Sequence, residues 1–242
     1  LGRFRFWRRS RKARGRITIH THMVLAATLV LTLGGWFALL ALEWHASLEG
    51  LDAADKWLAA FFQSVAARTA GFNSVPLTRL GEPGRLLTMG LMFVGGAPGS
   101  TAGGIKTTTM VVLALTVVAM LRGRRTTLYR RRAIPEAVVR EAIVIFLLSL
   151  FFVTGAFGAL LLTATPNPGG ANSLPLLFET VSAFGTVGLS LGMTPALSGA
   201  GRAIIIAVMF VGRLGPLTLA LVVGRPAAGG RVRYPEEEVV VG

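Results

Sequence analysis

The chain contains no cysteine and only three histidines among its 242 residues. Without cysteine it cannot form disulfides, thiol nucleophiles or cysteine-ligated metal sites. His20 and His22 lie one residue apart, but no carboxylate near them in the sequence completes a metal site. Ser, His and Asp are not arranged as a nucleophilic triad, and no pair of carboxylates indicates acid–base catalysis. We therefore expect a protein that is not an enzyme and that carries no cofactor in this chain.

Charged residues are also scarce, at 15% of the chain, whereas hydrophobic residues account for 52% and the mean hydropathy is +0.63. Values of this kind are typical of membrane proteins. Residues 23–42 and 142–165 are uncharged apolar runs, each long enough to cross a hydrocarbon layer of about 30 Å. Two interrupted spans are predicted at residues 86–121 and 202–223. These runs predict an all-α integral membrane protein.

The net charge of +14 is concentrated in three segments of the chain. Eight Lys or Arg lie in residues 1–22, seven in residues 122–140 and three in residues 225–233, and pairs of predicted spans separate these clusters. Acidic residues such as Glu49 and Asp52 instead follow the first span. Because cytoplasmic loops are enriched in Lys and Arg, we predict a multi-pass protein of the cell membrane, in contact with lipid, with both ends and the middle cluster in the cytoplasm. The clusters lack interleaved aromatic residues, so nucleic acid is not an expected partner.

Two segments repeat a Thr-x-Gly pattern after an apolar helix that is too short to cross a membrane. This order is that of a potassium-channel pore loop, in which backbone carbonyls replace the water shell of the ion. Gly lacks the Cβ that penalises unusual φ values, and each short helix points its negative C-terminal end at the cation. A pair of Gly turns between helices is the alternative interpretation. The first pore loop comprises Thr69, Ala70, Gly71 and Phe72 after a helix at residues 54–67, and the second comprises Thr186, Val187, Gly188 and Leu189 after a helix at residues 175–184.

The side chains of these loops have separate predicted tasks. Thr69 and Thr186 are expected to add hydroxyl oxygens to the carbonyls around the ion. Phe72 and Leu189 are expected to pack outward and hold the loops in place. Glu179, in the second short helix, is expected to bind backbone amides behind the loop, and the alternative is that it attracts ions.

Both loops occur within the same order of elements: a span, an outer polar linker, a short re-entrant helix, a Thr-x-Gly strand and a second, Gly-rich span. Internal duplication of this kind is common in transport proteins. We predict five segments, namely a basic cytoplasmic segment at residues 1–16, a first unit at 17–122, a basic cytoplasmic linker at 123–135, a second unit at 136–225 and a cytoplasmic tail at 226–242.

The sequence GGAPGSTAGG at residues 95–104, here called the Gly-rich loop, cannot continue a helix, because Gly is a poor helix former and Pro98 removes a backbone donor. It predicts a broken membrane helix, and unwound segments at membrane depth mark ion paths or gates. An enzyme that binds phosphate through this loop is the alternative, but Ile105 separates Gly104 from Lys106 and no strand precedes the loop, unlike a phosphate-binding loop. The residues assigned to the gate are Gly95, Gly96, Gly99, Ser100, Thr101, Ala102, Gly103, Gly104 and Lys106.

Lys106 and Arg213 stand in otherwise apolar segments that are predicted to be helical, with Arg213 at the middle of its span. An ionised side chain at the centre of a bilayer costs at least about 2.5–3.5 kcal/mol on insertion scales, so each needs a partner or water. Lys106 can reach an interface instead. This alternative is weaker for Arg213, which has about ten apolar residues on either side.

The strings RTAGFN, GGAPGSTAGGIKTTT, ETVSAFGTVGLS and MFVGRLGPLTL resemble the Trk/Ktr/HKT superfamily of potassium transporters. Ktr-type membrane subunits are more similar than Trk-type members, which tend to have Gly-Pro-Gly in place of TVGLS. The resemblance runs from about residue 17 to the end of the chain. Members have four span–pore-loop–span units in one polypeptide, and this chain resembles the third and fourth. We therefore expect it to be the C-terminal half of a longer protein.

The resemblance implies potassium uptake across the cell membrane. Gly71 and Gly188 would be filter glycines that bind potassium, and residues 95–104 would be an intramembrane gate. Arg213 would approach this gate, so we expect it to donate to carbonyl oxygens of residues 99–104 and to place a positive charge beside the ion path. It further implies a homodimer and a cytoplasmic regulatory ring of the KtrA/TrkA type, with the nucleotide (ATP, ADP or NAD) bound by that ring. Sodium dependence of the Ktr type is expected. The alternatives are a proton- or sodium-linked Trk-type transporter and a non-transporting membrane assembly subunit.

Overall fold

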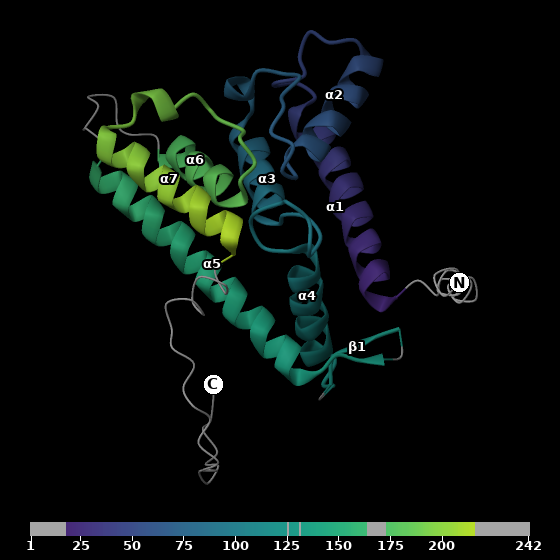
Figure 1. Cartoon of the computed structure of the whole chain (residues 1–242). Coiled ribbons are helices and arrows are strands. Elements are labelled where there is room, and N and C mark those ends of the chain that lie inside the picture. The colour runs from purple at the N-terminus through teal and green to yellow at the C-terminus, as the bar shows by residue number, and fades with distance from the viewer. Residues whose placement is uncertain (1–17, 125, 131, 164–172, 216–242) are drawn as a thin grey trace, which may run out of the picture.

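The computed structural model describes residues 18–124, 126–130, 132–163 and 173–215, and these residues are mostly helical (Figure 1). The predictions for residues 1–16, 216–223 and 226–242 lie outside the described residues. The elements are α1 (Ile19–Glu43), α2 (Ala53–Ala66), the short 3-10 helix η2 (Leu77–Arg79), α3 (Glu82–Phe93), α4 (Thr107–Leu121), β1 (Leu128–Tyr129), β2 (Arg132–Ala133), α5 (Glu136–Thr163), α6 (Ser173–Gly185), the 3-10 helix η3 (Thr194–Ala196) and α7 (Gly199–Leu214).

Two helices, α1 and α5, are long and apolar enough to cross a membrane. Helix α1 contains the predicted run at residues 23–42. Helix α5 corresponds to the run at residues 142–165, but it starts earlier, at Glu136, and the structure describes it as far as Thr163. Much of their apolar surface faces outward, as at Val30 and Phe151, which are 68% and 70% exposed. Such surfaces suit contact with lipid or with further membrane helices, because neither setting supplies water.

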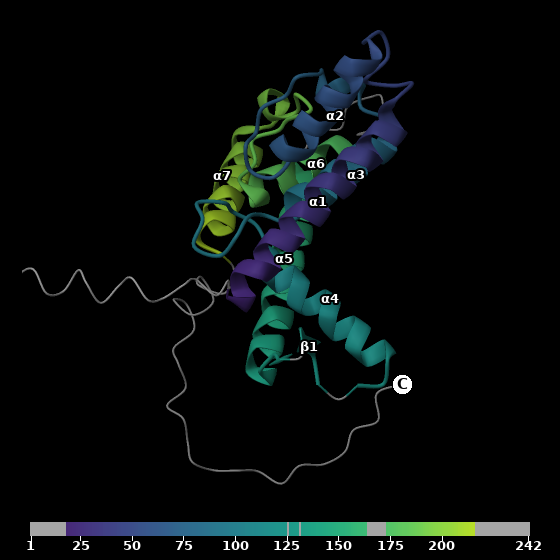
Figure 2. The same cartoon turned by 90° about the vertical axis from the view of Figure 1, so that its right-hand side faces the viewer.

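The predicted span at residues 86–121 is broken, as expected, into α3 and α4 on either side of the Gly-rich loop (Figures 1 and 2). The two ends of the loop are joined by a parallel bridge between Val94 and Ile105. In this bridge the amide of Gly95 donates to the carbonyl of Ile105 at 2.8 Å. Lys106 is the residue that precedes α4, with extended backbone, and is not inside a helix as predicted, because the helix cannot begin until the bridge ends.

The predicted span at residues 202–223 also needs correction. Helix α7 ends at Leu214, so Arg213 lies in its last turn and not at its middle. The reason is local: Gly215 has φ 85°, outside the helical region, and Pro216 follows it in the sequence. An Arg in the last turn is favourable, because the C-terminal end of a helix carries partial negative charge.

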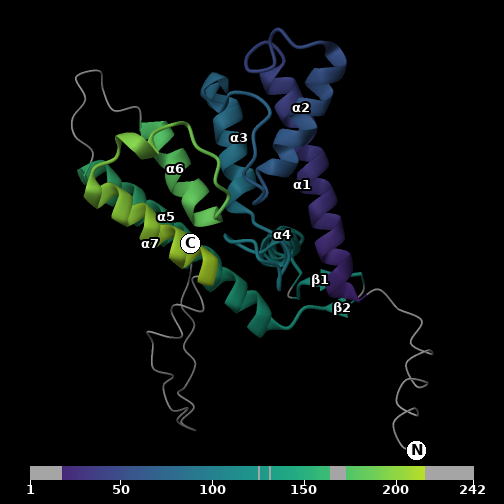
Figure 3. The same cartoon turned by 45° about the horizontal axis from the view of Figure 1, so that its top comes forward.

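The two predicted short helices are present as α2 and α6, within two residues of their expected bounds. They lie on opposite sides of α3 (Figures 1 and 3). Helix α6 is enclosed by α3, α5 and α7, and every residue from Phe178 to Gly185 is buried. One face of α2 is exposed instead, with Leu58 at 66%.

A short hairpin, β1–β2, lies in the segment predicted as a plain basic linker. Its strands pair Leu128 with Ala133. The hydroxyl of Tyr129 hydrogen-bonds Nδ1 of His22 in α1 at 2.7 Å, and the hydroxyls of Thr127 and Thr116 are 3.1 Å apart. The hairpin thus ties α1 to α4. A cavity of about 380 Å³ lies beside it, between the first turns of α1, α4 and α5.

Candidate functional site

The two pore loops share an unusual backbone. Thr69 and Thr186 have φ 72° and 50°, and the glycines two positions later, Gly71 and Gly188, have φ 75° and 95°. A non-Gly residue in this region costs about 1–2 kcal/mol, so the same strained position in both loops indicates one repeated design. Both glycines thus adopt the positive φ that the absence of a Cβ allows, as predicted. Neither segment is a β-strand, however, because a strand requires negative φ throughout.

Each loop is attached to the C-terminal end of its short helix. The amide of Gly71 donates to the carbonyl of Ala66 at 3.1 Å, and the amide of Val187 donates to the carbonyl of Ser182 at 3.0 Å. The helix ends, with their partial negative charge, therefore adjoin the first residues of both loops.

The loops also lie side by side. A Cβ placed on Gly71 would overlap the carbonyl oxygen of Val187 and would lie 3.6 Å from the Cα of Gly188. The outward-packing prediction holds for Leu189, which is 2% exposed. Phe72 is 70% exposed among the described residues, so its predicted packing stays a prediction.

Glu179 fixes the segment after the second pore loop. Its carboxylate is 5% exposed and accepts hydrogen bonds from the amides of Leu191 at 3.0 Å and Met193 at 3.3 Å. It also accepts from the hydroxyls of Ser190 at 2.6 Å and Thr194 at 2.8 Å. This matches the predicted contact with backbone amides. Hydrogen bonds to an ionised group are among the strongest in proteins, so this segment is firmly held.

The Gly-rich loop touches the second pore loop directly. The amide of Gly103 donates to the hydroxyl oxygen of Thr186 at 3.1 Å. A Cβ on Gly185 would lie 2.6 Å from the carbonyl oxygen of Met92, at the end of α3. Glycine is therefore needed where α6 meets the broken helix.

Two cationic side chains hold neighbouring carbonyls of the Gly-rich loop. Arg213 donates through Nη1 to the carbonyl of Thr101, and Lys106 donates through Nζ to the carbonyl of Ala102. The contact predicted between Arg213 and residues 99–104 is present. Between these carbonyls and the bridge at its base, the loop turns at Gly99, which has φ 80°. The other assigned residues follow the loop in order: Gly95 and Gly96 lie at its base, Ser100 at the turn, and Gly103 and Gly104 against α6.

The family model for TrkH, described as a cation transport protein, matches residues 16–226. This chain belongs to the TrkH family of cation transport proteins. As a member of that family it is a membrane protein of a transport class.

Similar relatives of this TrkH-family chain are potassium-uptake proteins by name. The chain is 40% identical to Ktr system potassium uptake protein B of Bacillus subtilis over 227 residues, which cover 93% of this chain and 50% of that protein. It is 40% identical to the protein of the same name from Vibrio alginolyticus, over 98% of this chain and 51% of that protein. Potassium/sodium uptake protein NtpJ of Enterococcus hirae is 37% identical over 94% of this chain and 51% of that protein. The chain thus spans about half the length of the curated relatives it matches.

A solved structure has the same fold. The potassium transporter TrkH from Vibrio parahaemolyticus matches with a TM-score of 0.66 and 22% identity, over 85% of this chain and 44% of that chain. At this identity the match shows the fold alone. It agrees with the predicted all-α pore-loop architecture, to which the hairpin is an addition.

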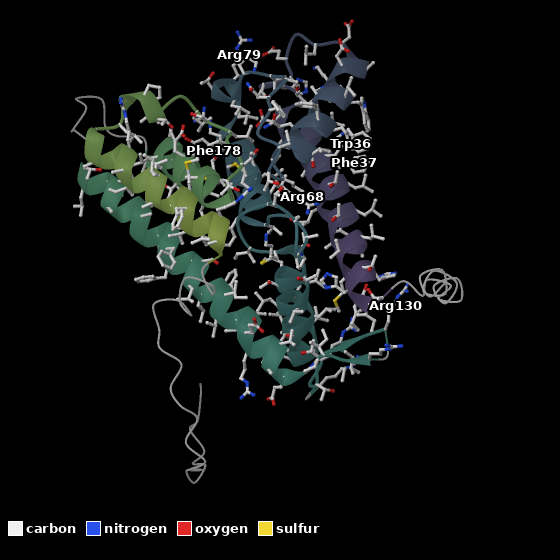
Figure 4. All side chains as sticks on the ribbon, in the orientation of Figure 1. Trp36, Phe37, Arg68, Arg79, Arg130 and Phe178 are labelled. Atoms are coloured by element: carbon white, nitrogen blue, oxygen red, sulfur yellow. The ribbon has the colours of Figure 1, made fainter. Side chains whose placement is uncertain are left out.

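Arg68, which directly precedes Thr69, is a site residue that the sequence analysis did not identify. Its guanidinium is half-buried and donates to the carbonyls of Thr28 in α1 and Gly95 at the base of the Gly-rich loop, each at 3.3 Å (Figure 4). Its position could have predicted this role. A single Arg at the end of an apolar short helix needs a partner for its charge, as Lys106 and Arg213 do. Arg68 connects the first pore loop to the loop that the second pore loop also touches.

The described residues offer oxygen atoms but no metal cluster. Among them, no three His, Asp or Glu side chains lie close enough together to hold a metal ion. The carbonyl oxygen of Val187 lies against Gly71, where the two pore loops meet. Carbonyls suit a monovalent cation that has lost its water shell.

Proposed function

We propose that this chain is the C-terminal half of a potassium-uptake protein and that its two pore loops form half of a selectivity filter. The observation that carries the proposal is the pair of adjacent loops with positive φ at the same Thr and Gly positions. One such loop occurs in many turns. Two of them, side by side and each at the C-terminal end of a short helix, are what an ion-coordinating ring requires.

In this proposal the chain permits selective permeation and performs no catalysis. Carbonyl oxygens of residues 69–72 and 186–189 replace part of the water shell of potassium, and the ends of α2 and α6 stabilise the positive charge. The N-terminal half of the protein supplies the other two loops. Potassium preference follows from glycine at positions 71 and 188. We further propose a sodium-dependent system of the Ktr type, with a Trk-type transporter as the alternative.

The Gly-rich loop acts as the gate in this proposal. It contacts the second pore loop through Gly103 and is held by Arg213 and Lys106 at Thr101 and Ala102. Two positive side chains beside the path oppose the passage of a cation. The gate opens when the loop moves away from these contacts.

The assembly proposed for the whole protein is a homodimer in the cell membrane. Positive charge at residues 1–22, 122–140 and 225–233 favours a cytoplasmic location for these three segments. The same charge suits a cytoplasmic ring of nucleotide-binding subunits as regulatory partner, with the nucleotide bound by that ring.

The test is potassium-dependent growth of a strain that lacks its own uptake systems and carries the full-length parent gene with its regulatory partner. Wild type should restore growth at low potassium, and Gly188→Ser should weaken the preference for potassium over sodium. Gly192→Ser is the matched control, because Gly192 also has positive φ, 84°, but no atom lies within 4 Å of a Cβ there.

The two possible failures mean different things. Absence of rescue by wild type that reaches the membrane would favour an assembly subunit that does not transport. Equal selectivity in Gly188→Ser and Gly192→Ser would remove Gly188 from the filter.

A further inference from the structure

Each short helix carries a buried polar residue six or seven positions before the Thr of its loop, but the two are bonded differently. Gln63 in α2 precedes Thr69 by six positions, and Glu179 in α6 precedes Thr186 by seven. Glu179 has four partners around its carboxylate. Gln63 is 2% exposed, and among the described residues neither its amide nitrogen nor its amide oxygen has a hydrogen-bond partner. A buried carboxamide without partners is costly, so this side chain needs an explanation.

Gln63 borders a small pocket. The pocket has a volume of about 10 Å³, and roughly 10–15 Å³ is what a single water needs. Its polar lining consists of Gln63, Ser47 and Glu43, and the rest of the lining is apolar. The hydroxyl of Ser47 also has no partner among the described residues, and Ser47 is 6% exposed. Three buried polar side chains, from α1, the turn after it and α2, therefore line one pocket about the size of a water molecule.

The carboxylate of Glu43 already accepts hydrogen bonds from protein groups. It accepts from the amide of Ser47 at 3.2 Å and from the amide of Gly81 at 3.1 Å. Gly81 precedes α3, whose N-terminal end carries partial positive charge. Gly84 lets the carboxylate approach this end, because a Cβ there would overlap the Oε1 atom of Glu43. The carboxylate therefore already has donors within the protein.

We propose that one water molecule occupies this pocket and joins Gln63 to Ser47 and Glu43. Only a molecule that both donates and accepts can satisfy the nitrogen and the oxygen of a carboxamide, and a metal cation would leave the nitrogen unpaired. The partner does not come from the other half of the protein, because Gln63 is already enclosed within this half. The site lies where the outer end of α1, the start of α3 and α2 meet.

The consequence concerns how the two pore loops are supported. Direct bonds to Glu179 hold the segment that follows the second pore loop, whereas a bound water holds the helix that precedes the first. Gln63 is thus a positioning residue for the first pore loop. This role in ion selection rests on the proposed function, but the water site does not.

The test uses the full-length parent protein with three variants. Gln63→Met removes both amide groups at nearly constant volume. Gln63→Glu keeps an acceptor and adds a second carboxylate beside Glu43. Ser64→Ala, on the same helix, removes a direct buried hydrogen bond, from the hydroxyl of Ser64 to the carbonyl of Thr32 at 2.8 Å, and gives the scale of such a loss.

We expect Gln63→Met to lower Tm by about 2–4 °C, as Ser64→Ala does, because it breaks the bonds to the water. Amide hydrogen exchange should rise at residues 69–73 and stay unchanged at residues 186–190. Gln63→Glu should lower Tm further, since two buried carboxylates repel each other.

Two results would overturn the proposal. A Tm of Gln63→Met equal to or above that of wild type would mean that the carboxamide has no partner. Stabilisation of the wild type by sodium over choline at fixed potassium, enlarged in Gln63→Glu, would identify the occupant as a cation. Both measurements are independent of transport, so they stand whether or not the selectivity test on Gly188 succeeds.

Discussion

The hydroxyl oxygen of Thr186 accepts a hydrogen bond from the amide of Gly103 at 3.1 Å. The residue that starts the second pore loop is therefore bonded to the loop that we propose as the gate. Movement of the Gly-rich loop must break this bond or carry Thr186 with it. Since Thr186 already has a strained φ of 50°, the pore loop and the gate are expected to respond to each other.

Replacing Thr186 tests this connection. Thr186→Val keeps the shape of the side chain but removes the acceptor, so the amide of Gly103 loses its partner, at a cost of about 1–3 kcal/mol. We expect higher potassium flux without the activating partner, measured with the full-length protein in liposomes. Thr186→Ser keeps the hydroxyl and should behave as wild type. Equal flux in the Val and Ser variants would show that the bond does not restrain the gate.

Arg213 is expected to hold the gate closed. Arg213→Ala removes both the donor to the carbonyl of Thr101 and a positive charge near the path, so potassium flux or leak should rise. The control is Arg202→Ala, because Arg202 lies on the same helix but donates to the carbonyl of Pro195 at 2.8 Å. Unchanged transport in Arg213→Ala would contradict the gating role.

Arg68 is expected to need its planar, two-sided guanidinium. It donates to Thr28 and Gly95 through different nitrogens of a rigid fork, whereas a lysine would have to reach both carbonyls from a single nitrogen. Arg68→Met should therefore reduce both Tm and potassium selectivity, and Arg68→Lys should recover part of each. Arg79→Met, at an exposed position, serves as control. Full recovery by lysine would leave only a requirement for charge.

Two variants of Glu179 distinguish a structural role of its carboxylate from the attraction of ions. Glu179→Gln keeps an acceptor oxygen but loses the charge, whereas Glu179→Ala loses every contact. If the carboxylate positions the segment at Ser190 and Thr194, uptake by the Gln variant should stay near wild type and uptake by the Ala variant should fall sharply. A rise in KM for potassium in the Gln variant, with Vmax unchanged, would instead support attraction of ions.

Local sequence signals were sufficient for the helices and for the break between α3 and α4. Their apolar runs, Gly and Pro act within a few residues, so the short helices were predicted within two residues of their bounds. The end of α7 was missed because the apolar pattern continues beyond Gly215, where the backbone turns. The hairpin was missed because two-residue strands leave almost no periodic pattern.

Contacts between distant segments could be predicted only where a buried charge demanded a partner. Arg213, in an otherwise apolar segment, needs oxygen partners, and the resemblance to the potassium-transporter superfamily indicated the Gly-rich loop as their source. The bond between Gly103 and Thr186 has no such signature, because a backbone amide and a hydroxyl can bond almost anything. Phe72 shows the opposite limit: its expected packing depends on a surface that the described residues do not contain.

The bridge between Val94 and Ile105 gives α4 a fixed point at one end. The fifteen residues of α4 form a rod about 22 Å long. Near its far end Thr116 is bonded to Thr127, beside the hairpin. Movement of the hairpin would therefore tilt α4 about the bridge between Val94 and Ile105. Lys106 follows the bridge directly and donates to the carbonyl of Ala102. A displacement of the hairpin would therefore be transmitted through α4 to the proposed gate.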